Sequence, residues 1–173
     1  MRVVSGELGG RRLVAPKGSD VRPTSDRARE ALFSILGDVQ GMDVCDLFCG
    51  TGALGIEALS RGAQSVVLVD TDTAPAEANV AALGVADRTE LMRRDAVAYL
   101  ESADATFDLV LCDPPYTLAA RVASDLEKLV PGRLREGGRL VVESPSHSPM
   151  DLDLTLDDDR TYGAASVRIW SVR

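Results

Sequence analysis

The sequence predicts a doubly wound α/β domain built on a mostly parallel, seven-stranded sheet. From residue 42 onward, short apolar runs alternate with longer segments that have helical periodicity. Glycines end two of these helical segments, at Gly62 and Gly84. The length of 173 residues is that of a chain that can bury its own core. Strand–helix alternation of this kind gives parallel strands with helices on both faces of the sheet.

The chain divides at about residue 37 into two parts. Residues 1–37 are expected to form a basic N-terminal extension, and residues 38–173 the main α/β domain. In the extension, β-like pieces at 2–5 and 12–15 surround a turn of two glycines, which predicts a hairpin. A helix follows it, with apolar residues on one face.

The remaining elements follow in chain order from the same patterns. We expect helices over 25–36, 53–61, 73–83, 96–102 and 118–129. We expect strands over 44–48, 66–69, 90–93, 107–112 and 140–143, and a closing antiparallel hairpin of 161–162 and 167–172. Ligands of such sheets bind beyond the carboxyl ends of the strands, at the switch point in strand order. The chemistry should therefore lie in the loops that follow the first four strands.

The composition is that of an ordinary globular protein, with 45% hydrophobic and 27% charged residues. No apolar run reaches the roughly 18–20 residues of a membrane helix, and the first residues lack the apolar core of a secretory signal. Three cysteines are an odd number, and two lie in apolar runs, which favours reduced thiols over disulfides. The single histidine, His147, lies far along the chain and argues against a zinc site. We expect a cytoplasmic protein without a metal or a membrane partner.

Charge is distributed unevenly along the chain. The net charge is −8, which argues against a protein that neutralises nucleic-acid phosphates over a whole face. Residues 1–30, however, hold seven basic and four acidic side chains, so they carry +3 and the rest of the chain −11. This asymmetry predicts either a solvated tail or a small basic patch on an acidic enzyme.

A glycine-rich loop follows the first strand of the main domain. The spacing Gly50-x-Gly52-x-x-Gly55 matches the dinucleotide fingerprint, and Asp70 stands 20 residues after Gly50, where a ribose-binding acid belongs. Glycines there let the backbone turn tightly and approach a ligand, and the helix behind them offers free N–H groups. On this loop alone, an enzyme that uses NAD and one that uses S-adenosylmethionine remain equal alternatives.

Two carboxylates favour S-adenosylmethionine. Asp46, just before the glycines, can attract the methionine ammonium of that cofactor, whereas it would repel a pyrophosphate. Asp95, after the third strand, can accept a hydrogen bond from an adenine amino group. The structural alternatives are a turn-capping role for Asp46 and a helix N-cap role for Asp95. The expected cofactor contacts are Asp46, Phe48, Gly50, Thr51, Gly52, Asp70, Asp95 and Ala96.

The sequence Asp113-Pro114-Pro115-Tyr116 after the fourth strand predicts the reaction. An aromatic amine is a poor nucleophile, because its lone pair is delocalised into the ring. Acceptors at the Asp113 carboxylate and the Pro114 carbonyl can hold both amine hydrogens and direct the lone pair toward an electrophilic methyl group. Pro115 stiffens the loop, and Tyr116 gives the base a flat face on which to stack. A hydride-transfer enzyme has no use for such a loop, so we expect an S-adenosylmethionine-dependent amino-methyltransferase.

The chain resembles the RsmD family of 16S rRNA guanine-N2 methyltransferases over nearly its whole length. The most specific motif is Arg22-Pro23-Thr24-Ser25-Asp26-Arg27-Ala28-Arg29-Glu30; segments 5–16 and 57–63 and the two loops described above add to it. The resemblance implies methylation of a guanine N2 in 16S rRNA, within an assembled or nearly assembled small ribosomal subunit. It also implies that Asp113 to Tyr116 hold the guanine. Members of the family often have Phe at the position of Tyr116, which leaves stacking intact.

The resemblance also offers an account of the basic segment, since a local basic arm can hold a ribonucleoprotein particle while the body stays acidic. The expected phosphate contacts are Arg11, Arg12, Arg22 and Arg27. Their structural alternative is salt bridges to Asp20, Asp26 or Glu30. Three other functions remain: methylation of adenine in DNA or RNA, methylation of a protein glutamine, and a non-catalytic assembly factor that binds the cofactor.

Overall fold

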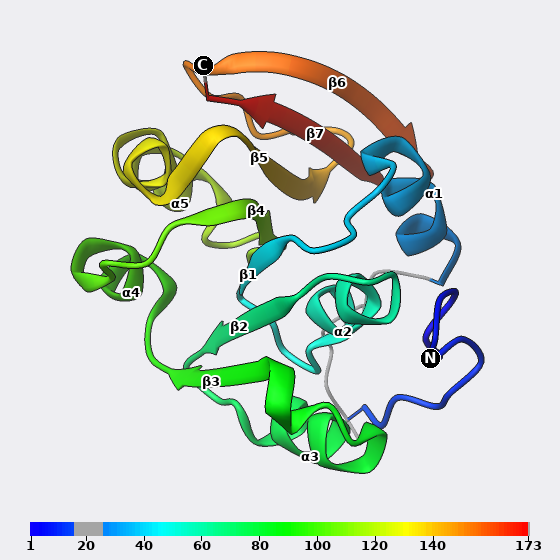
Figure 1. Cartoon of the computed structure of the whole chain (residues 1–173). Coiled ribbons are helices and arrows are strands. Elements are labelled where there is room, and N and C mark those ends of the chain that lie inside the picture. The colour runs from blue at the N-terminus through cyan, green and yellow to red at the C-terminus, as the bar shows by residue number, and fades with distance from the viewer. Residues whose placement is uncertain (16–25, 173) are drawn as a thin grey trace.

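The computed structural model describes residues 1–15 and 26–172 and contains one sheet of seven strands in the order β3-β2-β1-β4-β5-β7-β6 (Figure 1). The strands are β1 (Asp43–Leu47), β2 (Ser65–Asp70), β3 (Thr89–Arg93), β4 (Phe107–Cys112), β5 (Leu134–Pro145), β6 (Thr155–Tyr162) and β7 (Ala165–Ser171). Strands β3, β2, β1, β4 and β5 are parallel, whereas β7 runs antiparallel to both β5 and β6. The predicted doubly wound α/β fold with a closing hairpin is confirmed.

The switch point in strand order lies between β1 and β4. The chain moves from β1 outward to β2 and β3 and then returns to place β4 on the other side of β1. The crossover connections of the two halves therefore diverge at this point, and ligands of such sheets bind beyond the carboxyl ends of the strands here. This edge carries the glycine-rich loop and the Asp-Pro-Pro-Tyr loop.

Helices cover both faces of the sheet (Figure 1). They are α1 (Asp26–Leu36), α2 (Ala53–Ser60), α3 (Ala74–Leu83), α4 (Ala96–Ser102) and α5 (Ala119–Leu129), with short 3-10 turns at Ala86–Arg88 and Val130–Arg133. Residues of α1, α2 and α3 share one buried cluster with alternate residues of the strands. Residues of α4 and α5 share a second cluster with the strand residues between them. Because successive strand residues point to opposite faces, uninterrupted apolar strands such as β1 and β2 supply both layers.

Three expectations differ from the structure. Strand β5 begins six residues before the predicted start at residue 140, because the polar, glycine-containing stretch 135–138 forms a bulge against β4. Strand β6 begins at Thr155 rather than at residue 161, and it contains an acidic run at 157–159 that indicates a loop on composition. An edge strand packs little on either face, so it needs no apolar alternation. The expected N-terminal hairpin is reduced to one bridge, between Arg2 and Arg12.

Residues 1–15, hereafter the N-terminal segment, are packed against α2. The side chains of Val3 and Leu13 are 1% and 3% exposed and belong to the same cluster as α2 and α3. Gly6 has a φ of 82°, and a Cβ added there would lie 1.7 Å from the carbonyl oxygen of Ser60, so only glycine fits. The segment is therefore part of the folded core and not a solvated tail.

Candidate functional site

At the carboxyl-terminal edge of the sheet, strands β1, β2 and β4 end at the same level. Leu47 of β1 pairs with Val69 of β2 on one side and with Cys112 of β4 on the other. The residues that follow this level, Phe48, Asp70 and Asp113, therefore leave the sheet side by side. Parallel pairing thus brings together three segments of the sequence predicted to hold the cofactor and the reacting base.

The β1–α2 loop has an unusual backbone. Phe48 has a φ of 59°, the one positive φ of a non-glycine residue in the described ranges. Gly50 and Gly52 follow with φ values of 54° and 76°, and the N–H of Gly52 donates to the carbonyl of Cys49 at 2.7 Å. A bulky residue in this region costs of order 1–3 kcal/mol and is found mainly at functional sites. The loop is thus folded into a shape that the sequence alone does not favour.

Gly55, the third glycine of the fingerprint, serves packing. A Cβ at this position would lie 2.5 Å from Leu68 Cδ2 and 2.7 Å from Val66 Cγ2, both on β2. Without that carbon, α2 approaches the sheet closely and its N-terminus is brought against the strand ends, as the third glycine does in related folds. By contrast, a Cβ at Gly50 would meet nothing within 4 Å, so the protein leaves the loop uncovered there.

Asp46 lies beneath the loop and is only 1% exposed. Its Oδ2 accepts a hydrogen bond of 2.8 Å from the N–H of Gly55, in the first turn of α2. This is the turn-capping arrangement, although a carboxylate has acceptor sites for further partners. Burial raises the pKa of Asp46 to about 7, against the lowering effect of the Gly55 bond and with added repulsion from Asp113 and Asp70.

Asp70 ties two loops together. Its Oδ2 accepts from the N–H of Gly50 at 2.9 Å, and its Oδ1 accepts from the N–H of Asp72 at 3.1 Å. Asp72 in turn accepts from the N–H of Ala74 at 3.1 Å, at the start of α3. The carboxylate of Asp70 is therefore held at the mouth of the glycine loop, within the reach of a ligand bound there.

Asp95 is the N-cap of α4, since its Oδ1 accepts from the N–H of Ala98 at 3.0 Å. The side chain is exposed at the same edge of the sheet, whereas that of Ala96 is 3% exposed and packs in the core. The helix-cap alternative thus holds for one of the two carboxylate oxygens of Asp95, Oδ1. Contact between Ala96 and a cofactor would have to come from its backbone.

The Asp-Pro-Pro-Tyr loop follows β4 directly. Asp113 is partly buried, Pro114 is buried, and Pro115 accepts a hydrogen bond of 2.8 Å from the N–H of Leu118 that closes the turn. Tyr116, the last residue of the motif, is 53% exposed. Burial raises the pKa values of Asp46 and Cys112, and repulsion from Asp113 adds to both increases. Because Cys112 pairs with Leu47, the loop begins beside the glycine-rich loop.

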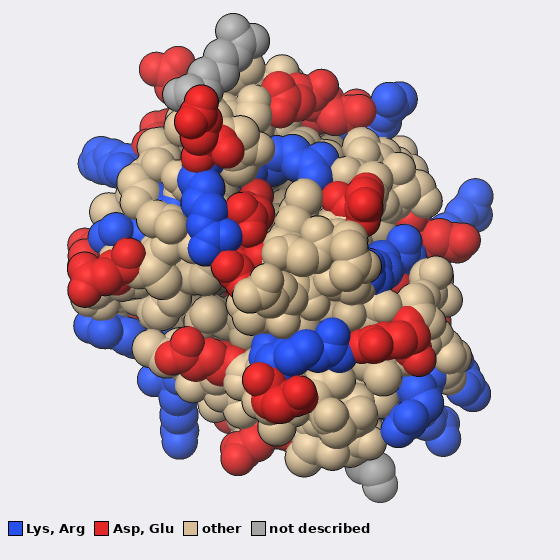
Figure 2. Space-filling model, viewed as in Figure 1, with Lys and Arg blue, Asp and Glu red and all other residues tan. Residues whose placement is uncertain are grey.

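The predicted phosphate-binding arginines have different surroundings. Arg11, Arg12 and Arg27 are exposed, and Arg11 Nη2 donates to the carbonyl of Ala82 at 3.4 Å, near the end of α3. Arg22 and its possible partner Asp20 lie outside the described residues. Basic and acidic side chains are interspersed over the face shown in Figure 2, in agreement with an acidic body that carries local basic groups.

The family-like motif residues Arg29 and Glu57 form a buried charged pair that sequence reasoning missed. Both side chains are fully buried, with 3.9 Å between Arg29 Nε and Glu57 Oε2. Glu57 accepts hydrogen bonds from the N–H groups of Val4 and Ser5 at 2.8 and 3.0 Å. Arg29 also binds Asp26 at 2.7 Å and the carbonyl of Arg2. A glutamate within the otherwise buried α2 was the available signal, because buried charges are paired.

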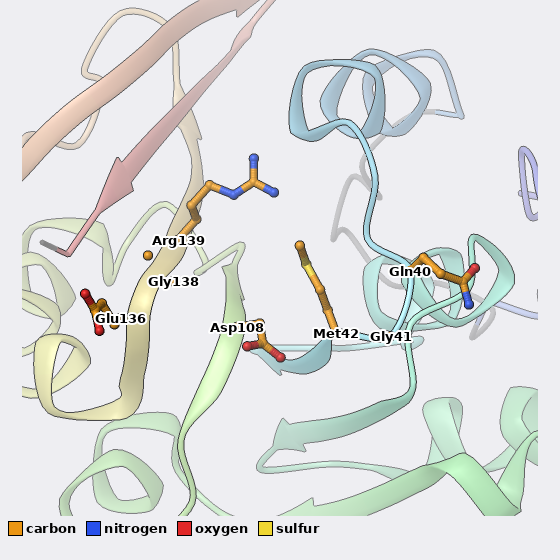
Figure 3. Close-up of a pocket in the computed structure, with 8 residues that line it drawn as sticks. Gln40, Gly41, Met42, Asp108, Glu136, Gly138 and Arg139 are labelled. Atoms are coloured by element: carbon orange, nitrogen blue, oxygen red, sulfur yellow. The ribbon is translucent and has the colours of Figure 1, made fainter.

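Two surface hollows lie away from this site. One, of about 290 Å³, is lined by residues that include Gln40, Met42, Asp108 and Arg139, at the opposite edge of the sheet (Figure 3). The other, of about 410 Å³, lies beside Pro131 and Leu154. Among residues 1–15 and 26–172, no group of three metal-binding side chains occurs. None of the helices in these ranges has the length and apolarity to cross a membrane.

Comparison with known proteins identifies the family. The family model described as "Conserved hypothetical protein 95" matches residues 1–171. A candidate rRNA methyltransferase of Bacillus subtilis, YlbH, is 34% identical over the full length of both chains. The ribosomal RNA small subunit methyltransferase D of Escherichia coli K12 is 35% identical over 67% of this chain and 60% of its own.

Solved structures agree with the family match. A hypothetical protein of Thermus thermophilus, TTHA0928, is 27% identical and superimposes with a TM-score of 0.86 over 99% of both chains. The fold, the loops at its switch point and the sequence relatives thus point to one group of proteins. The chain belongs to the conserved hypothetical protein 95 family, and the predicted resemblance to the RsmD rRNA methyltransferases is confirmed.

Proposed function

We propose that this protein methylates the exocyclic N2 amine of a guanine in 16S rRNA, with S-adenosylmethionine as the methyl donor. The observation that carries the proposal is the placement of the Asp-Pro-Pro-Tyr loop beside the glycine-rich loop at the switch point of the sheet. The small ribosomal subunit, assembled or nearly so, is the substrate particle, and the protein acts in the cytoplasm, where that particle is made.

The residues present fit this cofactor. The glycine loop is open at Gly50, Asp70 is fixed at its mouth, and Asp95 is exposed one strand further along. Asp46 is held under the loop, where a carboxylate favours the ammonium of a methionine moiety. Phe48, Thr51, Gly52 and the backbone of Ala96 complete the proposed cofactor contacts. When bound, the cofactor supplies a methyl group already activated on a sulfonium.

The catalytic loop positions the amine. The Asp113 carboxylate and the Pro114 carbonyl accept the two amine hydrogens, and the lone pair of the nitrogen then points along the line of attack. Asp113, or water, would accept the proton that the amine loses as its nitrogen takes up the methyl group supplied by the cofactor. Most of the acceleration comes from orientation, for which effective molarities reach about 10⁵ M or more. Tyr116 stacks on the guanine, which must be unpaired to enter.

The basic side chains bind the ribosomal particle. Arg11, Arg12 and Arg27 are exposed on or beside the N-terminal segment and contact rRNA phosphates, as we also propose for Arg22. Shape complementarity to a folded particle supplies the rest of the affinity, so the body of the protein remains acidic. Residues 1–37 thus act as the recognition part, and residues 38–173 as the methyl-transfer domain.

Methyl transfer to isolated small subunits tests the proposal. The purified protein is incubated with labelled S-adenosylmethionine and subunits from cells that lack the enzyme, and the product is digested to nucleosides. We expect the label in N2-methylguanosine. Label in a methyladenosine or a protein glutamine would overturn the guanine assignment. Absence of transfer by a protein that binds the cofactor would instead favour an assembly factor.

A further inference from the structure

Asn79 of α3 links two parts of the molecule that are far apart in sequence. Its side chain is fully buried. The Oδ1 accepts a hydrogen bond of 2.7 Å from the N–H of Val14, and Nδ2 donates to the carbonyl of Val14 at 3.0 Å. The same Nδ2 donates to the carbonyl of Thr51, in the glycine loop, also at 3.0 Å. One carboxamide therefore joins the N-terminal segment to the cofactor loop.

The carboxamide suits this position because each of its polar groups has a partner. It pairs with the backbone of Val14 through one donor and one acceptor, as a neighbouring strand would, and its second N–H reaches Thr51. A leucine of similar size would remove all three hydrogen bonds to the two segments, which are partly buried. No other uncharged side chain of this length presents two donors and an acceptor in one plane.

The N-terminal segment has several anchors. Those at Arg2 and Arg11 reach α1 and the end of α3, and two others lie on α2 and at Asn79. On α2, Ser60 Oγ accepts from the N–H of Leu8 at 2.9 Å and Glu57 holds residues 4 and 5. Among the described contacts, neither Ser60 nor Glu57 forms a hydrogen bond with the glycine loop. Of the anchors on α2 and at Asn79, the one at Asn79 contacts both the N-terminal segment and the glycine loop. A displacement of Val14 would therefore also disturb the hydrogen bond to Thr51.

We propose that Asn79 is a positioning residue that couples the docked N-terminal segment to the shape of the cofactor loop. The inference rests on the proposed role of the glycine loop as the cofactor site. A partner that holds the segment, through Arg11 or Arg12 beside Val14, then stabilises the loop geometry that binds the cofactor. Coupling of this kind is reciprocal, so cofactor binding also orders the segment for its partner.

Calorimetry with S-adenosylhomocysteine measures the effect on the loop. Asn79→Asp keeps the acceptor for Val14 but removes both donors, and Asn79→Ala removes the link without adding a charge, in case the aspartate fails to fold. We expect about tenfold weaker binding for either, the loss of roughly one hydrogen bond. Ser60→Ala is the matched control: it loosens the anchor on α2, so it should lower the melting temperature but leave affinity within about twofold.

Hydrogen exchange at the Val14 amide measures the coupling itself. In the native protein, S-adenosylhomocysteine should slow exchange at this amide, and in Asn79→Asp the ligand should have no effect on it. Asp70→Ala separates the two levels of the argument. If it leaves affinity unchanged, the proposed cofactor site fails, and the inference with it. If Asp70→Ala weakens binding while both Asn79 variants bind normally, or if Val14 is protected equally in Asn79→Asp, only the coupling is overturned.

Discussion

The single residues of the site have structural duties besides their proposed contacts with ligands. Asp46 holds the first turn of α2, Asp70 joins two loops, and Asp95 caps α4. Each carboxylate is thereby fixed in place before any ligand arrives, and pre-organised groups lose less entropy on binding. A sequence pattern gives the residue type and its position at a strand end, but it does not show which oxygen is already occupied.

Cofactor affinity should depend on pH through Asp46. The raised pKa of about 7 means that the carboxyl is protonated in the free protein below that pH. A cationic cofactor favours the carboxylate, so binding should release a proton, and affinity should rise with pH until about pH 7 and then level off. Calorimetry in buffers of different ionisation enthalpy detects the proton. Asp46→Asn should abolish this dependence, and an unchanged pH profile in that variant would contradict the role of Asp46.

Tyr116 should act through its ring and not through its hydroxyl. Tyr116→Ala should slow methyl transfer by a factor equivalent to about 1–3 kcal/mol, the contribution of one stacked base. Tyr116→Phe keeps the stacking face and should retain most activity. Because the side chain is 53% exposed, neither change should lower the melting temperature much. Equal losses in both variants would point to the hydroxyl instead.

At the scale of elements, the sequence predicts the order of helices and strands and the loops that carry the chemistry, because periodicity and glycine spacing are local signals. It does not predict contacts between distant segments. The motif residues Arg29 and Glu57 show the difference: their types are visible in the sequence, but their pairing through the core joins α1, α2 and the N-terminal segment. The positive φ of Phe48 is likewise not indicated by its residue type.

Removing the charge of Glu57 should destabilise the protein. Glu57→Gln removes the buried carboxylate that faces Arg29 and that pairs with Arg61 at 2.8 Å, and it sets an amide against the N–H groups of Val4 and Ser5. Breaking a buried pair from one side costs about 3–5 kcal/mol. Denaturant unfolding measures the loss, and Glu77→Gln, a substitution on α3 away from the pair, is the matched control. A loss of unfolding free energy below that of the control would show that the pair contributes little to docking of the N-terminal segment.

The basic N-terminal segment should bind rRNA. Reversal of its exposed charges should leave the cofactor site unaffected. Replacing Arg11 and Arg12 by Glu should abolish binding to small subunits, and the native affinity should fall steeply with salt. The alternative is that these side chains form exposed salt bridges, which contribute only about 0–1 kcal/mol. Under that alternative, subunit affinity would persist and any loss would follow a lower melting temperature. Cofactor affinity of the double variant, measured by calorimetry, is the internal control.

The molecule as a whole is an acidic, doubly wound domain whose proposed chemistry lies at one edge of the sheet. Parallel strands bring the glycine loop and the Asp-Pro-Pro-Tyr loop together, and the docked N-terminal segment borders the same edge through Asn79. Under the proposed function, substrate choice depends on a particle far larger than this domain. The central claim is therefore that this edge methylates one guanine of that particle.

The most direct test of this claim is mass mapping of 16S rRNA from cells without the protein, complemented with either the native chain or Asp113→Ala. Asp113 is proposed to hold the base amine and not the cofactor, so the variant should bind S-adenosylhomocysteine normally. The account predicts one N2-methylguanosine that is absent in the deletion strain, restored by the native chain and not restored by Asp113→Ala. Full restoration by Asp113→Ala, or an unchanged methylation map in the deletion strain, would contradict it.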